Sequence, residues 1–297
     1  MNIALFSGFR FHYEIFGYIM HFCESHGYYL TVYCYEDSHQ GYLDFYRATW
    51  PSIVYKDVSC FNKERHWYDK IFLLTDDDFN FHRGDLATND KTICIDHYYK
   101  IRSPEFKTRV TVRPFAKEYY RDWALPVFPL FNNKVLEPGI VTITILGDGS
   151  RYNTDILNRL TSAHGSIVIH AISRSMHVTK FKGLSASVKL FLHNNIQASA
   201  LYEILHRSNY LITDLVDDKD YTNLVMSAAV PLAFSTLTPL IISSQTNSFY
   251  KFKNVIEFDK NSQDPIDLVP IDIKLIRADR DDIMCKNNSL FLKLIVQ

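Results

Sequence analysis

The chain has 297 residues, 47% of them apolar, and a net charge of −1 at pH 7. This length predicts about two domains with sizeable cores, and the balanced charge excludes a bulk electrostatic attraction to nucleic acid or an anionic membrane. Five cysteines without tight spacing indicate reduced, buried thiols in a cytoplasmic protein, not disulfides or a zinc site. The sequence contains no apolar run of the roughly 18 residues that a transmembrane helix needs.

The first half alternates short apolar segments with amphipathic ones, which is typical of a parallel sheet with helical crossovers. The predicted strands are 2–6, 28–35, 52–55, 70–74, 92–95 and 109–112, and the predicted helices are 17–26, 41–48 and 115–123. The loop SGFRFHYE follows the first strand. Parallel sheets present ligand-binding groups at the carboxyl ends of their strands, so we expect this loop to carry function.

A proline-rich segment, ALPVFPLFNNKVLEPG, separates the two halves. It predicts a first domain over 1–132 and a second over 133–297. In the second half the predicted strands are 141–146, 166–172, 188–192, 210–212 and 239–243, with helices over 152–163, 198–207 and about 224–229, the last ending before Pro231. A final apolar segment, 290–296, predicts a helix that packs back on the N-terminal domain.

The stretch 209–243 predicts one strand–loop–helix–strand unit, whose loop opens a helix and can hold a phosphate on free N–H groups. Within it, MSAAVPLAFSTLTPLIIS resembles the nucleotide-sugar domain of GT-B-type glycosyltransferases. ALYEILHRSNYLITD resembles the helix and penultimate strand of that domain. One departure is that DDKDYTNL lacks the glutamate that many retaining members use to bind the donor ribose.

The resemblance implies an α/β protein with two Rossmann-like domains whose parallel sheets face a central cleft. It also implies a transferase that moves a sugar from a UDP- or GDP-linked donor to a glycan acceptor hydroxyl, as in glycan biosynthesis. The C-terminal domain would bind the donor and the N-terminal domain the acceptor. The nucleotide sugar is then a co-substrate, and the reaction needs neither a cofactor nor a metal.

Donor-binding candidates lie in four segments of the second half. Glycines after the first strand allow close backbone approach to a phosphate, arginines can pair with a diphosphate, and a helix start offers hydroxyl, amide and N–H groups. The candidates are Gly147, Gly149, Arg151, Arg174, His193, Asn194, Asp218, Thr222 and Asn223. A tight turn, solvated arginines and simple helix capping are the structural alternatives.

Catalytic candidates lie in the N-terminal half. His12 has an imidazole suited to act as a neutral general base, Glu14 is the reserve base, and Asp96 is a third candidate. Arg10, His97 and Tyr98 are predicted to bind the acceptor. The structural alternative for His12 is a partly buried residue packed between aromatic side chains.

Other functions stay open. Asp76 and Asp78 form a DxD motif after an apolar strand, which in GT-A-type glycosyltransferases holds a divalent metal on the donor diphosphate. A GT-A fold leaves the second series of strands, 141–243, unexplained. A dinucleotide- or SAM-dependent Rossmann enzyme is disfavoured because the sequence lacks GxGxxG. A GT-B-like protein that only binds glycans is the alternative without catalysis.

Overall fold

The chain forms two α/β units in a computed structural model. Met1–Phe128 with Ile283–Gln297 makes the first unit, and Pro129–Asp282 makes the second. The structure describes residues 1–10, 12–36, 40–74, 86, 89–96, 106–114, 122–147, 153–174, 178–213 and 227–296. Within these ranges, no helix has both the length and the apolar character required to cross a membrane.

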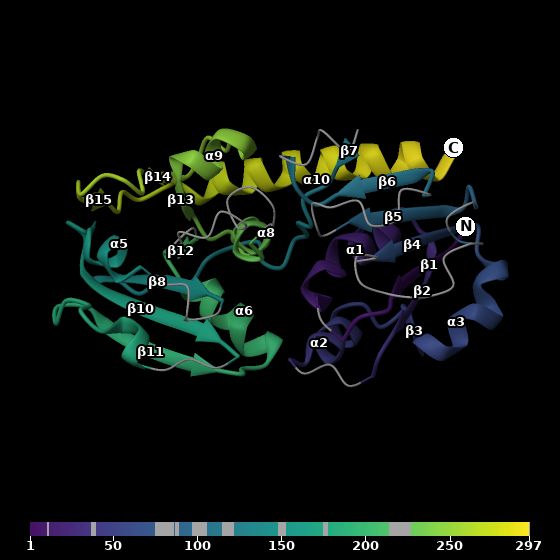
Figure 1. Ribbon diagram of the computed structural model, residues 1–297, viewed down its shortest axis with the longest axis horizontal. Helices are drawn as coiled ribbons and strands as arrows, with labels where there is room; N and C mark the ends of the chain where they lie inside the picture. The colour runs from purple at the N-terminus through teal and green to yellow at the C-terminus, as the bar shows by residue number, and fades with distance from the viewer. Residues whose placement is uncertain are drawn as a thin grey trace. The chain divides into compact units, whose positions relative to one another are not determined.

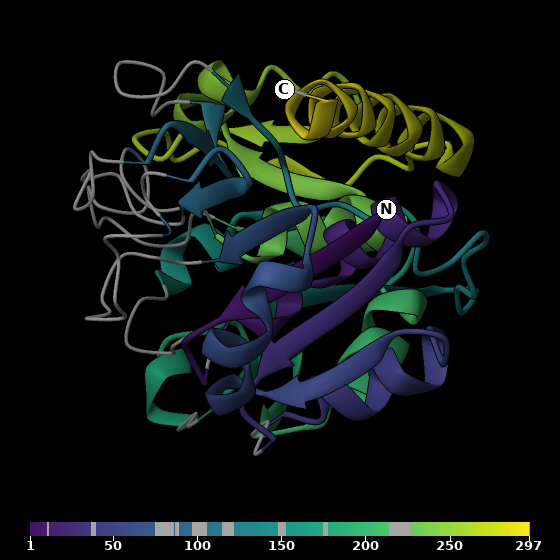
Figure 2. The same cartoon turned by 90° about the vertical axis from the view of Figure 1, so that its right-hand side faces the viewer.

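The first unit is built on a seven-stranded parallel sheet with the strand order β3-β2-β1-β4-β5-β6-β7. Its purple and blue strands lie side by side in Figure 2. Continuous apolar segments form the central strands because both faces of the sheet are covered. The strands are β1 (Asn2–Ser7), β2 (Tyr29–Cys34), β3 (Val54–Asp57), β4 (Lys70–Leu74), β5 (Thr92–Asp96), β6 (Thr108–Thr111) and β7 (Asp122–Trp123).

Helices and 3-10 turns of the first unit pack aromatic side chains against this sheet. They are η1 (Tyr13–Ile15), α1 (Gly17–Ser25), α2 (Tyr42–Thr49), α3 (Val58–Glu64) and η2 (Arg65–Trp67). α1 ends where predicted, because Gly27 takes the positive φ of 67° that stops a helix. At its start, a Cβ on Gly17 would lie 2.4 Å from the Phe128 ring, so only glycine permits this contact.

The C-terminal helix α10 runs over Ile273–Val296 and is far longer than the helix predicted for 290–296. Residues 283–296 belong to the first unit. There the Phe291 ring lies 5.3–5.6 Å from the rings of Tyr18, Phe22 and Phe72. The Asn287 side-chain amide also donates to the Leu125 carbonyl at 2.6 Å.

The second unit contains a six-stranded parallel sheet with the order β11-β10-β8-β12-β13-β14, drawn in teal and green in Figure 1. Its core joins Ile143 and Ile145 of β8 to Ile156, Leu157 and Phe181, and α6 also contacts β8. The strands are β8 (Ile140–Leu146), β10 (Ser166–Ser173), β11 (Lys189–Asn194), β12 (Tyr210–Ile212), β13 (Leu240–Ser243) and β14 (Ile256–Phe258). A small separate sheet pairs β9 (Leu160–Thr161) with β15 (Ile266–Asp267).

The helical segments described for the second unit are α5 (Thr154–Asn158), η6 (Val178–Phe181), α6 (Ala198–Arg207), α8 (Ala229–Ser235) and α9 (Ser244–Tyr250). Only α6 agrees with prediction, and neither η6 nor α9 was predicted. The helix predicted for 152–163 is shorter, because the chain enters β9 at Leu160. The prediction that a helix ends before Pro231 is wrong: α8 contains Pro231 in its first turn, where a helix needs no N–H donor.

Each sheet has one point where the strand order reverses. In the first unit the chain adds β2 and β3 on one side of β1 and then returns to place β4 on the other side. In the second unit it adds β10 and β11 beside β8 and then places β12 on the opposite side. Ligands of open α/β sheets bind outside the carboxyl ends of strands at such reversals. The loops after β1 and β8 therefore begin at the expected binding positions.

Candidate active site

The loop after β1 holds a histidine–carboxylate pair. His12 Nδ1 lies 3.1 Å from Glu14 Oε1, and the two side chains are 30% and 17% exposed. His12 has φ 64° and ψ 27°, a left-handed conformation that is uncommon for a residue other than glycine. Such conformations are retained where the surrounding structure imposes them, often at functional sites.

Aromatic side chains impose the conformation of this loop. The Tyr13 hydroxyl donates to the Tyr35 carbonyl after β2 at 3.1 Å, and the Tyr46 hydroxyl of α2 donates to the Tyr13 carbonyl at 2.8 Å. Arg10 is exposed, and its guanidinium lies 4.9 Å from the centre of the Tyr35 ring. Residues before and after His12 in the loop therefore contact the end of β2 and helix α2.

The pair determines which nitrogen of His12 can accept a proton. A carboxylate next to Nδ1 favours the tautomer that carries its hydrogen on Nδ1, and this leaves the lone pair on Nε2. The same carboxylate stabilises the imidazolium that forms when Nε2 takes a proton. Glu14, which the sequence placed in reserve as a base, is therefore positioned to orient His12.

Asp96 lies in a different environment at the end of β5. Its side chain is 1% exposed, and Oδ2 accepts from Arg109 Nε at 2.8 Å and from the second Arg109 guanidinium nitrogen at 2.6 Å. Cys94 Sγ lies 3.5 Å from Asp96 Oδ1. A buried carboxylate held by an arginine is poorly placed to take a proton from a substrate, and this geometry ties β5 to β6.

In the second unit, four donor-binding candidates line one edge of the sheet. The register places Leu146, Ile172 and His193 in one row across β8, β10 and β11, and Ser173 beside Asn194 in the next. Gly147 and Arg174 directly follow β8 and β10. The Gly147 N–H donates to the Ile172 carbonyl at 3.0 Å, so this amide is used within the sheet.

His193 has a partner that the sequence did not reveal. His170 Nδ1 lies 2.8 Å from His193 Nε2, and the two rings are within 7° of parallel. Burial, together with the neighbouring His193, lowers the pKa of His170 to about 4, and burial also lowers the pKa of His193. Both rings are therefore neutral at pH 7, and one donates a hydrogen bond to the other.

The remaining predicted site residues lie outside the described ranges. They are His97 and Tyr98, the Asp76–Asp78 motif, Gly149, Arg151, Asp218, Thr222 and Asn223. Among the described residues, no group of three His, Cys, Asp or Glu side chains is arranged to hold a metal ion. The loop anchors Tyr35 and Tyr46 were missed because no local motif marks them; the high aromatic content, with 19 Tyr and 21 Phe, was the signal that the sequence offered. His170 was interpreted as a structural histidine, and its pairing with His193 was not predicted.

Comparison with known proteins identifies the fold. No protein-family profile and no curated protein matches the sequence. Among solved structures, the chain is similar to AviGT4, a glycosyltransferase involved in avilamycin A biosynthesis, with a TM-score of 0.64, 7% identity and coverage of 99% of this chain and 97% of that one. It is also similar to an α-glucosyltransferase in complex with UDP and a 13-mer DNA containing a HMU base, with a TM-score of 0.58, 10% identity and full coverage of both chains.

These full-length similarities show that the chain has the GT-B glycosyltransferase fold, as the sequence resemblance predicted. At 7–10% identity they establish the architecture alone. The activity must be argued from the residues of this chain.

Proposed function

We propose that this chain is a glycosyltransferase that moves a sugar from a UDP-linked donor to an acceptor hydroxyl without a metal ion. The observation that carries the proposal is the His12–Glu14 pair after β1, at the strand reversal of the first unit. On a GT-B fold, a base in this loop belongs to the half that binds the acceptor. The donor then binds to the carboxyl edge of the second sheet.

In the proposed reaction, His12 Nε2 takes the proton of the acceptor hydroxyl as its oxygen bonds to the anomeric carbon. The bond from that carbon to the donor phosphate oxygen breaks, and the nucleoside diphosphate leaves with the bonding electron pair. Glu14 stabilises the imidazolium that results. The configuration at the anomeric carbon is inverted, because attack and departure occur on opposite faces. This step requires no oxidant, reductant or cofactor.

UDP is the proposed nucleotide because the similar α-glucosyltransferase was solved with UDP, both with DNA and alone. A GDP-linked donor is the alternative. Arg174 at the edge of the second sheet, with Arg151, would neutralise the diphosphate in place of a metal, and the helix start predicted at Thr222 and Asn223 would donate hydrogen bonds to it. The five cysteines are all free thiols, which favours a reducing, cytoplasmic location.

The proposed acceptor is a glycan hydroxyl. A modified DNA base is the second candidate, because the α-glucosyltransferase of similar fold was solved with DNA containing a HMU base. The net charge of −1 favours the glycan, since DNA-binding proteins depend on positive charge to neutralise phosphates.

Incubating the protein in EDTA with single UDP- and GDP-sugars, without acceptor, tests for a working enzyme. Mass spectrometry should detect slow release of free sugar and nucleoside diphosphate from one donor. Adding glycan acceptors should accelerate the release and produce a glycosylated product, whereas hydroxymethylated DNA should not. If the protein binds nucleotide but turns over no donor with either class of acceptor, it is a binder and the proposal is wrong.

A further inference from the structure

Tyr13 lies between His12 and Glu14 in the chain, and hydrogen bonds hold its backbone in place. The Tyr13 carbonyl belongs to the peptide group that joins Tyr13 to Glu14. It accepts from the Phe16 N–H at 3.1 Å and from the Tyr46 hydroxyl at 2.8 Å. The first of these bonds closes a turn along the chain, and the second ties the turn to α2. The backbone that carries the Glu14 carboxylate is therefore held from another element.

Packing fixes the direction of the Tyr46 hydroxyl. The Tyr46 side chain is fully buried. Its ring lies 5.7 Å from the Trp50 ring, 6.3 Å from the Phe128 ring and 6.4 Å from the Phe16 ring, measured between centroids. These neighbours restrict the rotation of the side chain, so the hydroxyl stays aimed at the Tyr13 carbonyl.

The contact between His12 and Glu14 depends on this bond. His12 Nδ1 lies 3.1 Å from Glu14 Oε1, and His12 has the left-handed φ of 64°, which persists only where neighbours impose it. Without the Tyr46 hydroxyl, the Tyr13 carbonyl keeps its bond within the turn but loses the bond to α2. The peptide group before Glu14 can then rotate and carry the carboxylate away from Nδ1. The imidazole loses the acceptor that keeps its hydrogen on Nδ1.

We propose that Tyr46 is a positioning residue of the transferase site. Its hydroxyl fixes the peptide group between Tyr13 and Glu14 and thereby keeps the Glu14 carboxylate on His12 Nδ1. Tyr46 acts through Glu14 and takes no part in proton transfer. Its effect on catalysis rests on the proposed function, whereas its effect on the tautomer of His12 does not.

Nitrogen NMR of isotope-labelled histidine rings at alkaline pH tests the positioning directly. Wild-type His12 should show a protonated Nδ1 and an unprotonated Nε2, and its signals are identified by their absence in His12→Asn. Tyr46→Phe removes only the hydroxyl and keeps the ring. It should shift the His12 signals toward the tautomer mixture of a free imidazole.

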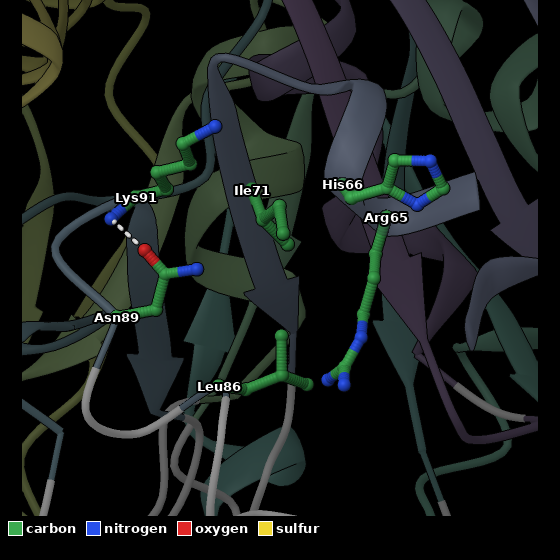
Figure 3. A pocket seen from close by; sticks show the side chains of 6 residues that line it. All are labelled: Arg65, His66, Ile71, Leu86, Asn89 and Lys91. Atoms are coloured by element: carbon green, nitrogen blue, oxygen red, sulfur yellow. Dashed lines mark hydrogen bonds between the residues drawn. The ribbon is translucent and has the colours of Figure 1, made fainter. Parts of the chain in front are cut away.

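His66 provides the internal control for this measurement. It is exposed and lines a cavity of about 270 Å³ together with Ile71, the second residue of β4, and Lys91, which directly precedes β5 (Figure 3). The cavity therefore lies toward the amino ends of these strands, at the edge of the sheet opposite to the loop after β1. The nitrogen signals of His66 should be the same in the wild type and in Tyr46→Phe.

Sugar-transfer kinetics measure the consequence for catalysis. Tyr46→Phe should lower kcat about three- to tenfold, the usual value of one hydrogen bond, and leave KM unchanged, because a fully buried side chain does not contact the substrates. Tyr210→Phe is the matched control and should transfer sugar as the wild type does. The Tyr210 hydroxyl also donates to a backbone carbonyl, that of Val269 at 2.9 Å, but it belongs to the second unit.

A double-mutant cycle shows whether Tyr46 acts through Glu14. In a Glu14→Ala background, Tyr46→Phe should cost little more, since both changes disrupt the same pair. Additive losses, or unchanged His12 signals in Tyr46→Phe, would overturn the proposal. A wild-type His12 that shows both tautomers would overturn it without any variant of Tyr46. Transfer by His12→Asn within a few-fold of the wild type would contradict the proposed function instead, and the NMR comparison would still decide whether Tyr46 positions the pair.

Discussion

His12 combines a left-handed backbone, a carboxylate partner and partial exposure in one residue. The sequence could predict a base at this position from the residue type and from the loop after the first strand. It could not show that Glu14 Oε1 lies 3.1 Å from His12 Nδ1. The orientation of side chains in this loop depends on contacts with Tyr35 and Tyr46, which are distant in the sequence. It also could not show that Asp96 is held by Arg109, a residue of the next strand.

Replacing His12 with asparagine should remove the base and keep the fold. Asparagine tolerates the left-handed conformation better than most residues, so the melting temperature should stay near that of the wild type. Sugar transfer should fall by about 10²–10⁴, the usual contribution of a general base, while UDP affinity stays unchanged. Steady-state kinetics and calorimetry measure the two effects. Transfer within a few-fold of the wild type would show that His12 is not the base.

Lys134 is a partly buried lysine of the second unit, and it should make stability depend on pH. Its ammonium donates to the Leu205 carbonyl at the end of α6 and to Thr238 Oγ1 at 2.9 Å. Burial lowers the pKa of Lys134 from 10.5 to about 7. Between these values the unfolded chain binds more protons than the folded one, so stability should increase with pH from about 7 to 10.5.

Lys134→Met should abolish most of this increase. Urea denaturation at pH 7.5 and pH 9 should show the wild type gaining up to about 1.4 kcal/mol of unfolding free energy per pH unit, and the variant gaining little. Lys63→Met, at an exposed site, should behave as the wild type does. Equal slopes for wild type and Lys134→Met would show that Lys134 is not the cause.

At the scale of elements, strands were easier to predict than helices. The central strands are continuous apolar segments, so their positions follow from composition. α10 was predicted only in its last part, because Arg277, Asp279 and Arg280 interrupt its apolar pattern. Arg280 is nevertheless 3% exposed and donates to the Phe131 carbonyl at 2.7 Å. A long-range contact of this kind cannot be inferred from local periodicity.

The last part of α10 should contribute strongly to the stability of the first unit. Phe291 is fully buried among Tyr18, Phe22 and Phe72. Phe291→Ala removes these contacts and leaves a cavity, so it should lower the free energy of unfolding by about 3–5 kcal/mol. Leu275→Ala, at a 47% exposed position of the same helix, should have little effect. Chemical denaturation compares the two, and similar losses would contradict the packing described for Phe291.

At the scale of the whole chain, the alternation of strands and helices predicted two parallel-sheet units, and the fold class is confirmed. The order of the strands was not predictable, since it depends on which side of β1 and β8 each later strand pairs. That order matters for function because it places the loops after β1 and β8 at the strand reversals. The proposal that the second unit binds the donor comes from the resemblance carried by residues 209–243.

Calorimetric titration with nucleotides in EDTA tests the central claim, that the second unit binds a nucleoside diphosphate without a metal. UDP or GDP should give saturable binding that adding Mn²⁺ does not strengthen appreciably. NAD and S-adenosylmethionine should give none, and His12→Asn should bind UDP as the wild type does. Failure of both diphosphates to bind would contradict the account. Binding that requires Mn²⁺ and is lost in Asp76→Ala or Asp78→Ala would equally contradict it and indicate a metal-dependent donor site.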